Sequence, residues 1–469
     1  MKRILSIILA LISILTLASC YKEDEIKITQ DNTSSVIEET SEKSSYTDKT
    51  VYIPKENENG KLLYREGIEF SKPVLTTYYH NYSSAVSLTF DDGYDEKTGY
   101  YVSKIFNRYG FTGTAMISAT FVDSEYKQNE WNKIFSYGYL DLGVHGWEHI
   151  NAEEITSEEI LNNETIEARD FLKNAFPTQN VLTFATPFTG ITDEYKAKIQ
   201  EFAISNRLGG NGTNTSLTGD LYLCKAISFG GGRSYTEITP KIDVYLSRGE
   251  WISVLMHVIK DDDVKKEEFD ALCLYLSQKE SVWVSSFERV SIYAKQLENA
   301  RLDYTYADSE KIKFKLSCDL DSSIYNIPMS AKIYIPDFVT TAYVVVEGEA
   351  QKAFVKRDPF GKYVVALDIP VGEEVTIYLG ENNHCENDCP NHEYVLKEEV
   401  ESTCVECGYT LYMCNECGDT YKARYTVPKG HKLDYSTETV IKAPTDYTTG
   451  ISKSTCTACK SDVEYVVRP

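Results

Sequence analysis

The chain has 469 residues, a length that allows two to four domains, and 42% of them are hydrophobic, as is ordinary for a globular protein. Its formal net charge of −23 at pH 7 argues against a nucleic-acid-binding protein, because a phosphate backbone requires a basic surface.

The first twenty residues have the layout of a secretory signal peptide. Lys2 and Arg3 precede an uncharged apolar run over residues 4–17, which is too short to span a bilayer comfortably. The run ends in LASC, which resembles a bacterial lipobox; an ordinary signal peptide with a chance cysteine is the alternative. We expect residues 1–19 to be removed and Cys20 to carry lipid that anchors the mature chain outside the cytoplasm, at the bacterial cell membrane.

The segment after Cys20 is rich in Ser, Thr and charged residues and poor in aromatic residues. Such a segment cannot bury enough apolar surface to fold alone. We expect residues 20–60 to form a flexible tether between the lipid and the first domain.

Between residues 61 and 300, apolar strand-like runs alternate with helix-like patterns. The runs are AVSLTF, GTAMIS, LGVH, VLTFAT, EFAIS, KAISF, WISVLMH and SVWVSS. One helical pattern covers residues 157–176, where Ser157 is a suitable N-cap. This alternation predicts an α/β fold, with a mostly parallel sheet or barrel and helices outside it. In such folds the active groups gather at the carboxyl ends of the strands.

Two further segments follow this α/β region. Residues 301–382 alternate apolar and polar side chains between turns, which predicts a small antiparallel β domain of the sandwich type. Residues 383–469 hold eight of the twelve cysteines and a faint repeat of roughly 39 to 42 residues. Such cysteines indicate either a second, structural zinc, with His392 or His431 as a further ligand, or disulfides. The candidate cysteines are Cys404, Cys407, Cys414, Cys417, Cys456 and Cys459.

The stretch SLTFDDGYDE places two adjacent carboxylates directly after an apolar strand. Successive side chains of a strand point to opposite faces, so Asp91 and Asp92 can face one pocket only if the chain turns there, which Gly93 permits. Two like charges in contact repel each other unless a cation lies between them. The pair therefore predicts a metal site, with a solvated turn as the alternative.

Two histidines lie at and just after the end of the strand-like run at residues 142–145. His145 and His149 have the i, i+4 spacing that lets both imidazoles bind one ion. With Asp92 they would supply two nitrogens and one carboxylate, which suits zinc and other divalent first-row ions and leaves positions open for water and substrate. His257 ends another apolar strand, as Asp91 does; a core histidine is the alternative there.

Together these residues resemble the motifs of the polysaccharide deacetylase family, carbohydrate esterase family 4. TFDDG, HGWEH, FATPFTG and VLMH, which begin at residues 89, 145, 184 and 254, resemble its first, second, third and fifth motifs. The resemblance covers residues 84–298 and implies a distorted (β/α) barrel. It implies a hydrolase of carbon–nitrogen bonds other than peptide bonds, which removes N-acetyl or O-acetyl groups from an extracellular or cell-wall polysaccharide.

The resemblance also implies a role for each matching residue. Asp91 is the general base and His257 the general acid, while Asp92, His145 and His149 hold the divalent metal. Zinc is the expected ion, with cobalt, nickel and manganese as alternatives.

Three further positions are implied to bind the substrate, and one position departs from the family. Pro187 and Phe188 would line the sugar groove, and Leu255 the pocket for the acetyl methyl group. Ala185 stands where the family often has an arginine that orients the base. Arg207 and Arg233 are the candidates to replace that arginine.

Two other functions remain open from the sequence. HGWEH also fits H-x-x-E-H, the inverted zinc-peptidase signature with Glu148 as base. That motif must lie on a helix, where Gly143 and Gly146 are unfavourable. Alternatively, the barrel is inactive and serves as an envelope-anchored carbohydrate-binding or adhesion protein, which the absent arginine favours.

Overall fold

The fold is that of a computed structural model. It describes residues 55–56, 62–65, 68–70, 73–93, 95–188, 190–210, 212, 217–230, 234–259, 263–307, 311–335, 341–346, 349–351, 355–358, 361–380, 394–405, 408–415, 420–426 and 429–469. Outside this set lie Cys20 with the signal peptide and most of the tether, and also Arg233, His392, Cys407, Cys417 and the side chain of Cys414. Among the described residues, no helix combines the length and the apolar character needed to cross a membrane.

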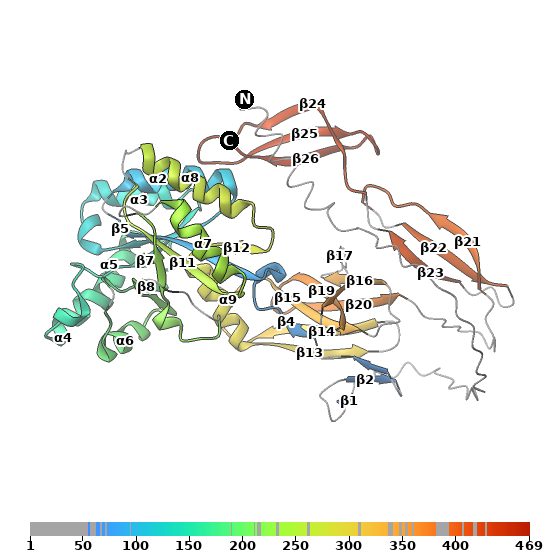
Figure 1. The fold of residues 1–469 in the computed structure, drawn as a ribbon, viewed down its shortest axis with the longest axis horizontal. Coiled ribbons are helices and arrows are strands. Elements are labelled where there is room, and N and C mark those ends of the chain that lie inside the picture. The colour runs from blue at the N-terminus through green and yellow to red at the C-terminus, as the bar shows by residue number, and fades with distance from the viewer. Residues whose placement is uncertain are drawn as a thin grey trace. The chain divides into compact units, whose positions relative to one another are not determined.

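An eight-stranded parallel sheet forms the centre of the α/β region (Figure 1). Its order is β10-β11-β5-β6-β7-β8-β9, with β12 paired to β5. A parallel bridge joins Arg207, the last residue of β9, to Cys224, just before β10, so the sheet nearly closes into a barrel. The expected fold class is confirmed. The strands are β5 (Ser84–Asp92), β6 (Gly113–Ile117), β7 (Leu140–Val144), β8 (Thr183–Ala185), β9 (Ser205–Arg207), β10 (Ala226–Ser228), β11 (Trp251–Met256) and β12 (Val282–Val284).

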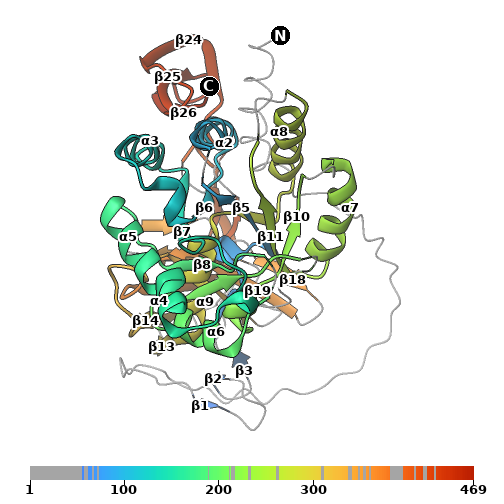
Figure 2. The same cartoon turned by 90° about the vertical axis from the view of Figure 1, so that its left-hand side faces the viewer.

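Helices surround this sheet (Figure 2). They are α2 (Glu96–Tyr109), α3 (Glu125–Phe135), α4 (Glu158–Asn162), the π-helical turn η4 (Asn163–Glu167), α5 (Ala168–Ala175), α6 (Asp193–Gln200), α7 (Tyr235–Leu246), α8 (Asp263–Ser277) and α9 (Phe287–Asn299). Short 3₁₀ turns are η1 (Tyr79–Asn81), η2 (Ala119–Val122), η3 (Ala152–Glu154) and η5 (Leu221–Leu223). Ser157 caps α4 by accepting a hydrogen bond from the backbone N–H of Ile160, as expected.

The helices and the sheet bury one continuous apolar core. Phe90 of β5 packs edge-on against Phe106 of α2 and Phe269 of α8, and all three side chains are buried. One expected strand lies elsewhere: residues 201–204 of EFAIS form a turn and bend after α6, and β9 begins only at Ser205. Its pairing with β8 through Ser205 and Asn206 sets this later start.

Two antiparallel sheets follow the barrel. Their orders are β13-β14-β20-β16-β17 and β18-β19-β15-β4. Val74–Leu75 (β4) falls in the range expected for the barrel, yet it pairs with β15. The other strands are β13 (Ala300–Ala307), β14 (Lys311–Cys318), β15 (Met329–Ile335), β16 (Thr341–Val346), β17 (Glu349–Gln351), β18 (Val355–Asp358), β19 (Gly361–Ile369) and β20 (Glu374–Gly380).

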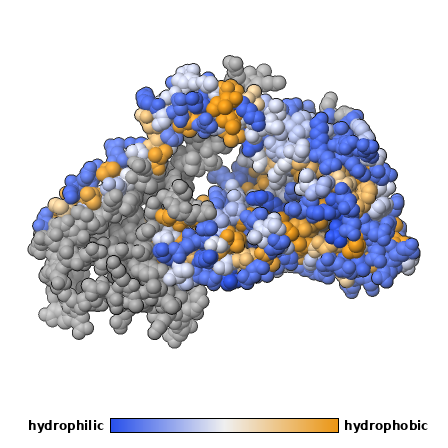
Figure 3. Space-filling view, turned by 180° about the vertical axis from the view of Figure 1, so that it is seen from behind, coloured by the Kyte–Doolittle hydropathy of each residue, from blue (hydrophilic) through white to orange (hydrophobic). Residues whose placement is uncertain are grey.

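The cysteine-rich segment contains two three-stranded antiparallel sheets of the same simple order, which agrees with the sequence repeat. Their strands are β21 (Tyr394–Val400), β22 (Gly408–Cys414), β23 (Thr420–Thr426), β24 (Leu433–Lys442), β25 (Gly450–Cys456) and β26 (Asp462–Val467). Near the N-terminus, β1 (Lys55–Glu56), β2 (Leu62–Arg65) and β3 (Ile68–Phe70) form a third such sheet, although Lys55–Glu56 was expected in the tether. Where Figure 3 colours the surface, it is mostly hydrophilic with scattered apolar groups, as the strong negative charge leads one to expect.

Candidate active site

The end of β5 turns so that two neighbouring aspartates face the same histidine. Asp92 has a φ of +76° and Gly93 a φ of +81°, so the chain leaves the extended conformation there. Nε2 of His145 consequently lies 3.8 Å from Oδ2 of Asp91 and 3.7 Å from Oδ1 of Asp92. A positive φ at a residue other than glycine costs about 1–3 kcal/mol and is typical of functional sites.

Packing and one hydrogen bond hold this turn. The indole Nε1 of Trp131 donates to the carbonyl of Gly93 at 3.0 Å. A Cβ on Gly93 would lie 2.7 Å from Cγ1 of Ile117, closer than carbon atoms can pack. Gly93 is therefore required both for its φ and for its lack of a side chain.

Asp92, His145 and His149 form a group that suits a metal ion. Their candidate ligand atoms all lie within 4.8 Å of one another, and Nε2 of His149 is 3.5 Å from Oδ1 of Asp92. Two imidazoles and one carboxylate are a donor set typical of divalent first-row metals, and these distances require only small movements to enclose an ion. The residues present therefore fit the metal that the sequence predicts.

The orientation of His145 is fixed by a backbone oxygen. Nδ1 of His145 lies 2.7 Å from the carbonyl oxygen of Ala185. Because a carbonyl only accepts hydrogen bonds, Nδ1 carries the proton and Nε2 keeps its lone pair for a metal. Burial lowers the pKa of His145 to about 4, although the charge of Asp91 opposes this shift. The imidazole is therefore neutral at neutral pH, as a ligand must be.

Glu164 organises the loop that carries both histidines. Its side chain is fully buried, and it accepts hydrogen bonds from the backbone N–H groups of Trp147, Glu148 and Ile150 at 3.2, 2.7 and 3.2 Å. A Cβ on Gly146 would lie 2.5 Å from Oε2 of Glu164, so a residue with a side chain would not fit here without rearrangement. Glu164 lies on the π-helical turn η4, a distortion frequent near functional sites.

Arg207 contacts Asp91. Its Nη2 donates to Oδ1 of Asp91, and both side chains are almost fully buried. Burial by itself raises the pKa of Asp91, but the charge of Arg207, the charge of His145 and this hydrogen bond outweigh it and hold the pKa below its usual value. Asp91 is thus ionised at neutral pH. Ala185 leaves the usual arginine position empty, and Arg207 from the neighbouring strand β9 supplies the guanidinium instead.

His257 and Asp91 line the same small cavity. The cavity lies at the ends of β5 and β11, and Trp131 and Thr98 close another part of it. Unlike Asp91, His257 is exposed to solvent. The cavity thus has a buried carboxylate inside and an exposed imidazole at its edge.

The three residues expected to bind substrate have different environments. Phe188 has 55% of its surface exposed, a φ of +61°, and a ring centred 4.9 Å from that of His149. Pro187, the residue before Phe188, is buried. Its Cγ lies 3.5 Å from the place that a Cβ on Gly146 would occupy. Leu255 is buried in β11 and is not among the residues that line the small cavity.

The peptidase alternative does not agree with this geometry. HGWEH lies in a bend after β7 and has no helical residues, whereas the inverted zinc-peptidase motif requires a helix. The sequence does not single out Glu164, because a buried glutamate within a helical pattern cannot be told from a solvent-exposed one. Its place on the buried side of the predicted helix was the only available indication.

Residues 80–206 match the family model of polysaccharide deacetylases. The match contains Asp91, Asp92 and both histidines, and it supports a polysaccharide deacetylase domain in this part of the chain. Arg207 and His257 lie beyond the matched residues.

One curated relative is gellan lyase from Bacillus sp., which is 23% identical over 322 residues. That alignment covers 63% of this chain, and the chain spans about 13% of the length of that relative.

Several solved structures are similar to this chain. Peptidoglycan deacetylase PdaC from Bacillus subtilis has 16% identity and a TM-score of 0.35, over 47% of this chain and 96% of its own. A family 4 acetyl xylan esterase from Clostridium thermocellum, solved with a cobalt ion, has 13% identity and a TM-score of 0.34, over 44% and 90%. A CE4 family pseudoenzyme from Bacillus anthracis has 14% identity and a TM-score of 0.34, over 45% and 66%.

Proposed function

We propose that the barrel is a metal-dependent hydrolase that removes acetyl groups from an acetylated extracellular or cell-wall polysaccharide. The observation that carries this proposal is the placement of Asp91, paired with Arg207, directly beside the donor set of Asp92, His145 and His149. The family match over residues 80–206 supports the same reaction class.

We assign the metal to Asp92, His145 and His149, with zinc as the first choice and cobalt, nickel and manganese as alternatives. A divalent ion held there supplies Lewis acidity, which polarises a carbonyl group and lowers the pKa of a coordinated water. The donor set provides one negative charge and two neutral nitrogens.

Asp91 acts as the general base in this proposal. It is ionised because Arg207 offsets the effect of burial, and it can accept a proton from the attacking water. The guanidinium of Arg207 hydrogen-bonds to the base, so it is a positioning residue that keeps Oδ1 of Asp91 occupied and leaves Oδ2 available.

His257 acts as the general acid. It shares a cavity with Asp91, and its exposure lets it exchange protons with solvent between turnovers. Donation to the leaving nitrogen is essential for an amide, because a free amide anion is a very poor leaving group. An O-acetyl ester requires this proton less.

The substrate approaches along Phe188 in this proposal. Its exposed ring beside His149 offers an apolar surface for a sugar face, with Pro187 behind it. We keep Leu255 as the residue nearest the acetyl methyl group, since it lies near the end of β11, two positions before His257, which directly follows that strand.

We also propose that Cys20 carries lipid and holds the enzyme at the outer face of the cell membrane. The apolar run that ends in LASC supports this placement. An intact-mass measurement of the mature N-terminus tests it. A free Tyr21 or an unmodified Cys20 would exclude the anchor.

An inactive, carbohydrate-binding barrel is the second candidate. Ala185 in place of the usual arginine favours it, whereas the contact of Arg207 with Asp91 favours the hydrolase. Acetate release separates the two functions. The full chain, loaded with metal, is assayed on peptidoglycan, chitin oligomers, poly-N-acetylglucosamine and acetylated xylan. The hydrolase requires acetate release from at least one glycan, lost in Asp91→Asn. Binding without release from any of them would support the second candidate.

A further inference from the structure

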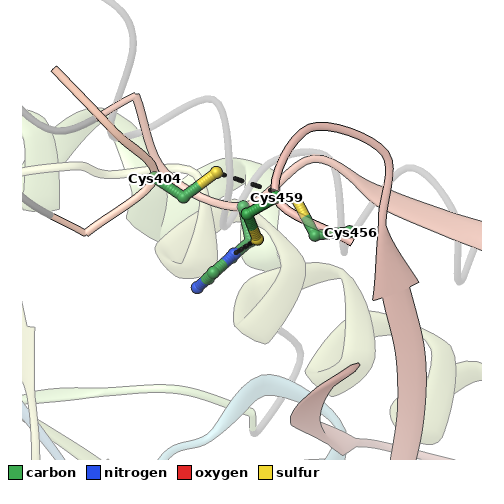
Figure 4. A group of neighbouring side chains, drawn as sticks. Cys404, Cys456 and Cys459 are labelled. Atoms are coloured by element: carbon green, nitrogen blue, oxygen red, sulfur yellow. Dashed lines mark hydrogen bonds between the residues drawn. The ribbon is translucent and has the colours of Figure 1, made fainter. Parts of the chain in front are cut away.

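The cysteine-rich segment brings four possible metal ligands together, far from the barrel motifs in sequence. They are Cys404, between β21 and β22; His431, before β24; Cys456, at the end of β25; and Cys459, before β26. Their ligand atoms all lie within 4.8 Å of one another. Figure 4 shows the sulfurs of Cys404 and Cys456 directed toward each other, with Cys459 beside them.

The distances match those of ligands on one tetrahedral zinc ion. Two sulfurs, each about 2.3 Å from a zinc, lie about 3.8 Å apart, and a sulfur and an imidazole nitrogen lie about 3.5 Å apart. The Sγ atoms of Cys404 and Cys456 are 3.8 Å apart, and Sγ of Cys459 is 3.3 Å from Nδ1 of His431. A disulfide instead requires about 2.0 Å between its sulfurs.

The backbone around these ligands is ordered by hydrogen bonds. The carbonyl of Cys404 accepts from Gly430 N at 3.1 Å, which places Cys404 next to the residue before His431. Thr457 N donates to the carbonyl of Lys432 at 2.7 Å, which joins the C-x-x-C turn to the residue after His431. The four ligands are therefore held together by contacts that do not depend on the sulfurs themselves.

The C-x-x-C turn has further features that suit a bound metal. Ser461 Oγ donates to Sγ of Cys459 at 3.1 Å, so this sulfur already receives a polar hydrogen that stabilises a thiolate. Lys460, directly after the second cysteine, has a φ of +62°, which is uncommon for a residue with a side chain. The turn thus brings the sulfurs of Cys456 and Cys459 to the same group of candidate ligands.

The described side chains of this part of the chain bury little apolar surface. Among residues 395–405, 408–413, 415 and 429–469, whose side chains the structure describes, the buried hydrophobic side chains are those of Cys404 and Cys456. Three-stranded sheets without an apolar core need a covalent or metal cross-link. A metal bound here joins the sheet β21-β22-β23 to the sheet β24-β25-β26.

We propose that Cys404, His431, Cys456 and Cys459 bind a structural zinc ion that cross-links the two C-terminal sheets. The site uses one cysteine from the first repeat and three ligands from the second. It does not rest on the function proposed for the barrel, and its donor set differs, because the barrel group contains no sulfur.

Alkylation of the purified, unreduced full chain tests this site. We expect Cys404, Cys456 and Cys459 to resist a thiol reagent until a chelator is added, and then to react without a reductant. Cys318 is the control, since it is half-buried and outside the group, and its labelling should not depend on the chelator. Labelling of the three cysteines only after reduction would identify disulfides and overturn the proposal. Labelling without a chelator would do the same.

Cobalt substitution provides a second measurement that remains informative if a variant folds poorly. A thiolate-to-cobalt charge-transfer band should appear in the wild-type chain and lose intensity in Cys456→Ser, together with one equivalent of metal. His431→Cys retains four ligands, so it should keep the metal and intensify the band. His145→Ala with His149→Ala should leave the band unchanged. A band of equal intensity in wild type and Cys456→Ser would exclude this site.

Discussion

Arg207 and Asp91 form a buried ion pair between the ends of two strands, β9 and β5, that are not neighbours in the sheet. Strands β6, β7 and β8 separate them along the hydrogen-bonded order, so the pair reaches across the barrel. This ion pair, which depends on the near closure of the sheet, holds the carboxylate of Asp91, the base of the proposed reaction, in place.

Arg207→Ala should lower kcat on an acetylated substrate by about 10- to 100-fold, the usual effect of removing a group that orients the reacting residues. Metal content at saturating metal should be unchanged, because the hydrogen bond of the Arg207 guanidinium goes to Asp91 and not to a proposed ligand. Loss of one partner of a buried pair should also destabilise the fold by about 3–5 kcal/mol. Arg207→Lys, which keeps the charge, should recover part of both losses. Arg248→Ala is the matched control, since that side chain is largely exposed. Wild-type kcat in folded Arg207→Ala would show that Arg207 does not position the base.

Glu164→Gln should weaken metal binding in the barrel by about 10- to 100-fold. Each carboxylate oxygen of Glu164 accepts from a backbone N–H, whereas a glutamine amide presents an NH₂ group to one of those donors. The histidine loop should therefore shift. Glu167→Gln, an exposed change on the same π-helical turn, is the control. Metal titration of the two metal-free variants compares their affinities. Equal affinities would show that Glu164 does not position the metal ligands.

The pair Glu288 and Asp141 should make the fold less stable as the pH rises. Burial, and then the charge of Asp141, raise the pKa of Glu288 to about 8, and burial also raises the pKa of Asp141. Since the folded state holds the proton of Glu288 more tightly than the unfolded state does, the stabilisation from this group is complete below about pH 4.5 and is lost as the pH approaches 8. Glu288→Gln should flatten this slope, which is at most about 1.4 kcal/mol per pH unit for one group.

Denaturant unfolding of wild type and Glu288→Gln at several pH values measures this effect. The glutamine loses one of the hydrogen bonds from Asn180 Nδ2 and Leu182 N, so the absolute stability also changes. The slope with pH is therefore the quantity to compare. Parallel curves for the two proteins would contradict the prediction.

His257→Ala should reduce amide hydrolysis more than ester hydrolysis. A positioned general acid contributes about 10²- to 10⁴-fold, and the nitrogen leaving group requires its proton more than an oxygen leaving group does. Metal content should not change. The ratio of N-acetyl to O-acetyl cleavage, measured on one preparation of each protein, tests this prediction. An equal loss on both substrates would mean that His257 does not protonate the leaving group.

The sequence predicts the barrel and its ligand group well for a clear physical reason. Apolar runs mark the buried parallel strands. Asp92 ends one of them, and His145 and His149 follow another, so a shared sheet edge brings them together. The roles of these residues remain predictions. The start of β9 was misplaced because the apolar residues of EFAIS also suit the packing of a turn against the core.

Other contacts depend on tertiary structure that no local pattern encodes. Arg207 was one of two candidates, and the closure of the sheet is what selects it. Likewise, the C-x-x-C spacing pairs Cys456 with Cys459, but Cys404 and His431 come together with them only through the packing of two sheets.

Acetate release and metal content, measured together on wild type, Asp91→Asn and Asp92→Asn, test the proposed hydrolase most directly. Asp91→Asn should retain the barrel metal and lose activity by about 10²- to 10⁴-fold, because only the base is removed. Asp92→Asn should bind the metal weakly, and excess metal should restore part of its turnover. Retention of metal by Asp92→Asn with its loss from Asp91→Asn would contradict the assigned roles. Unchanged acetate release in both variants would contradict the mechanism itself.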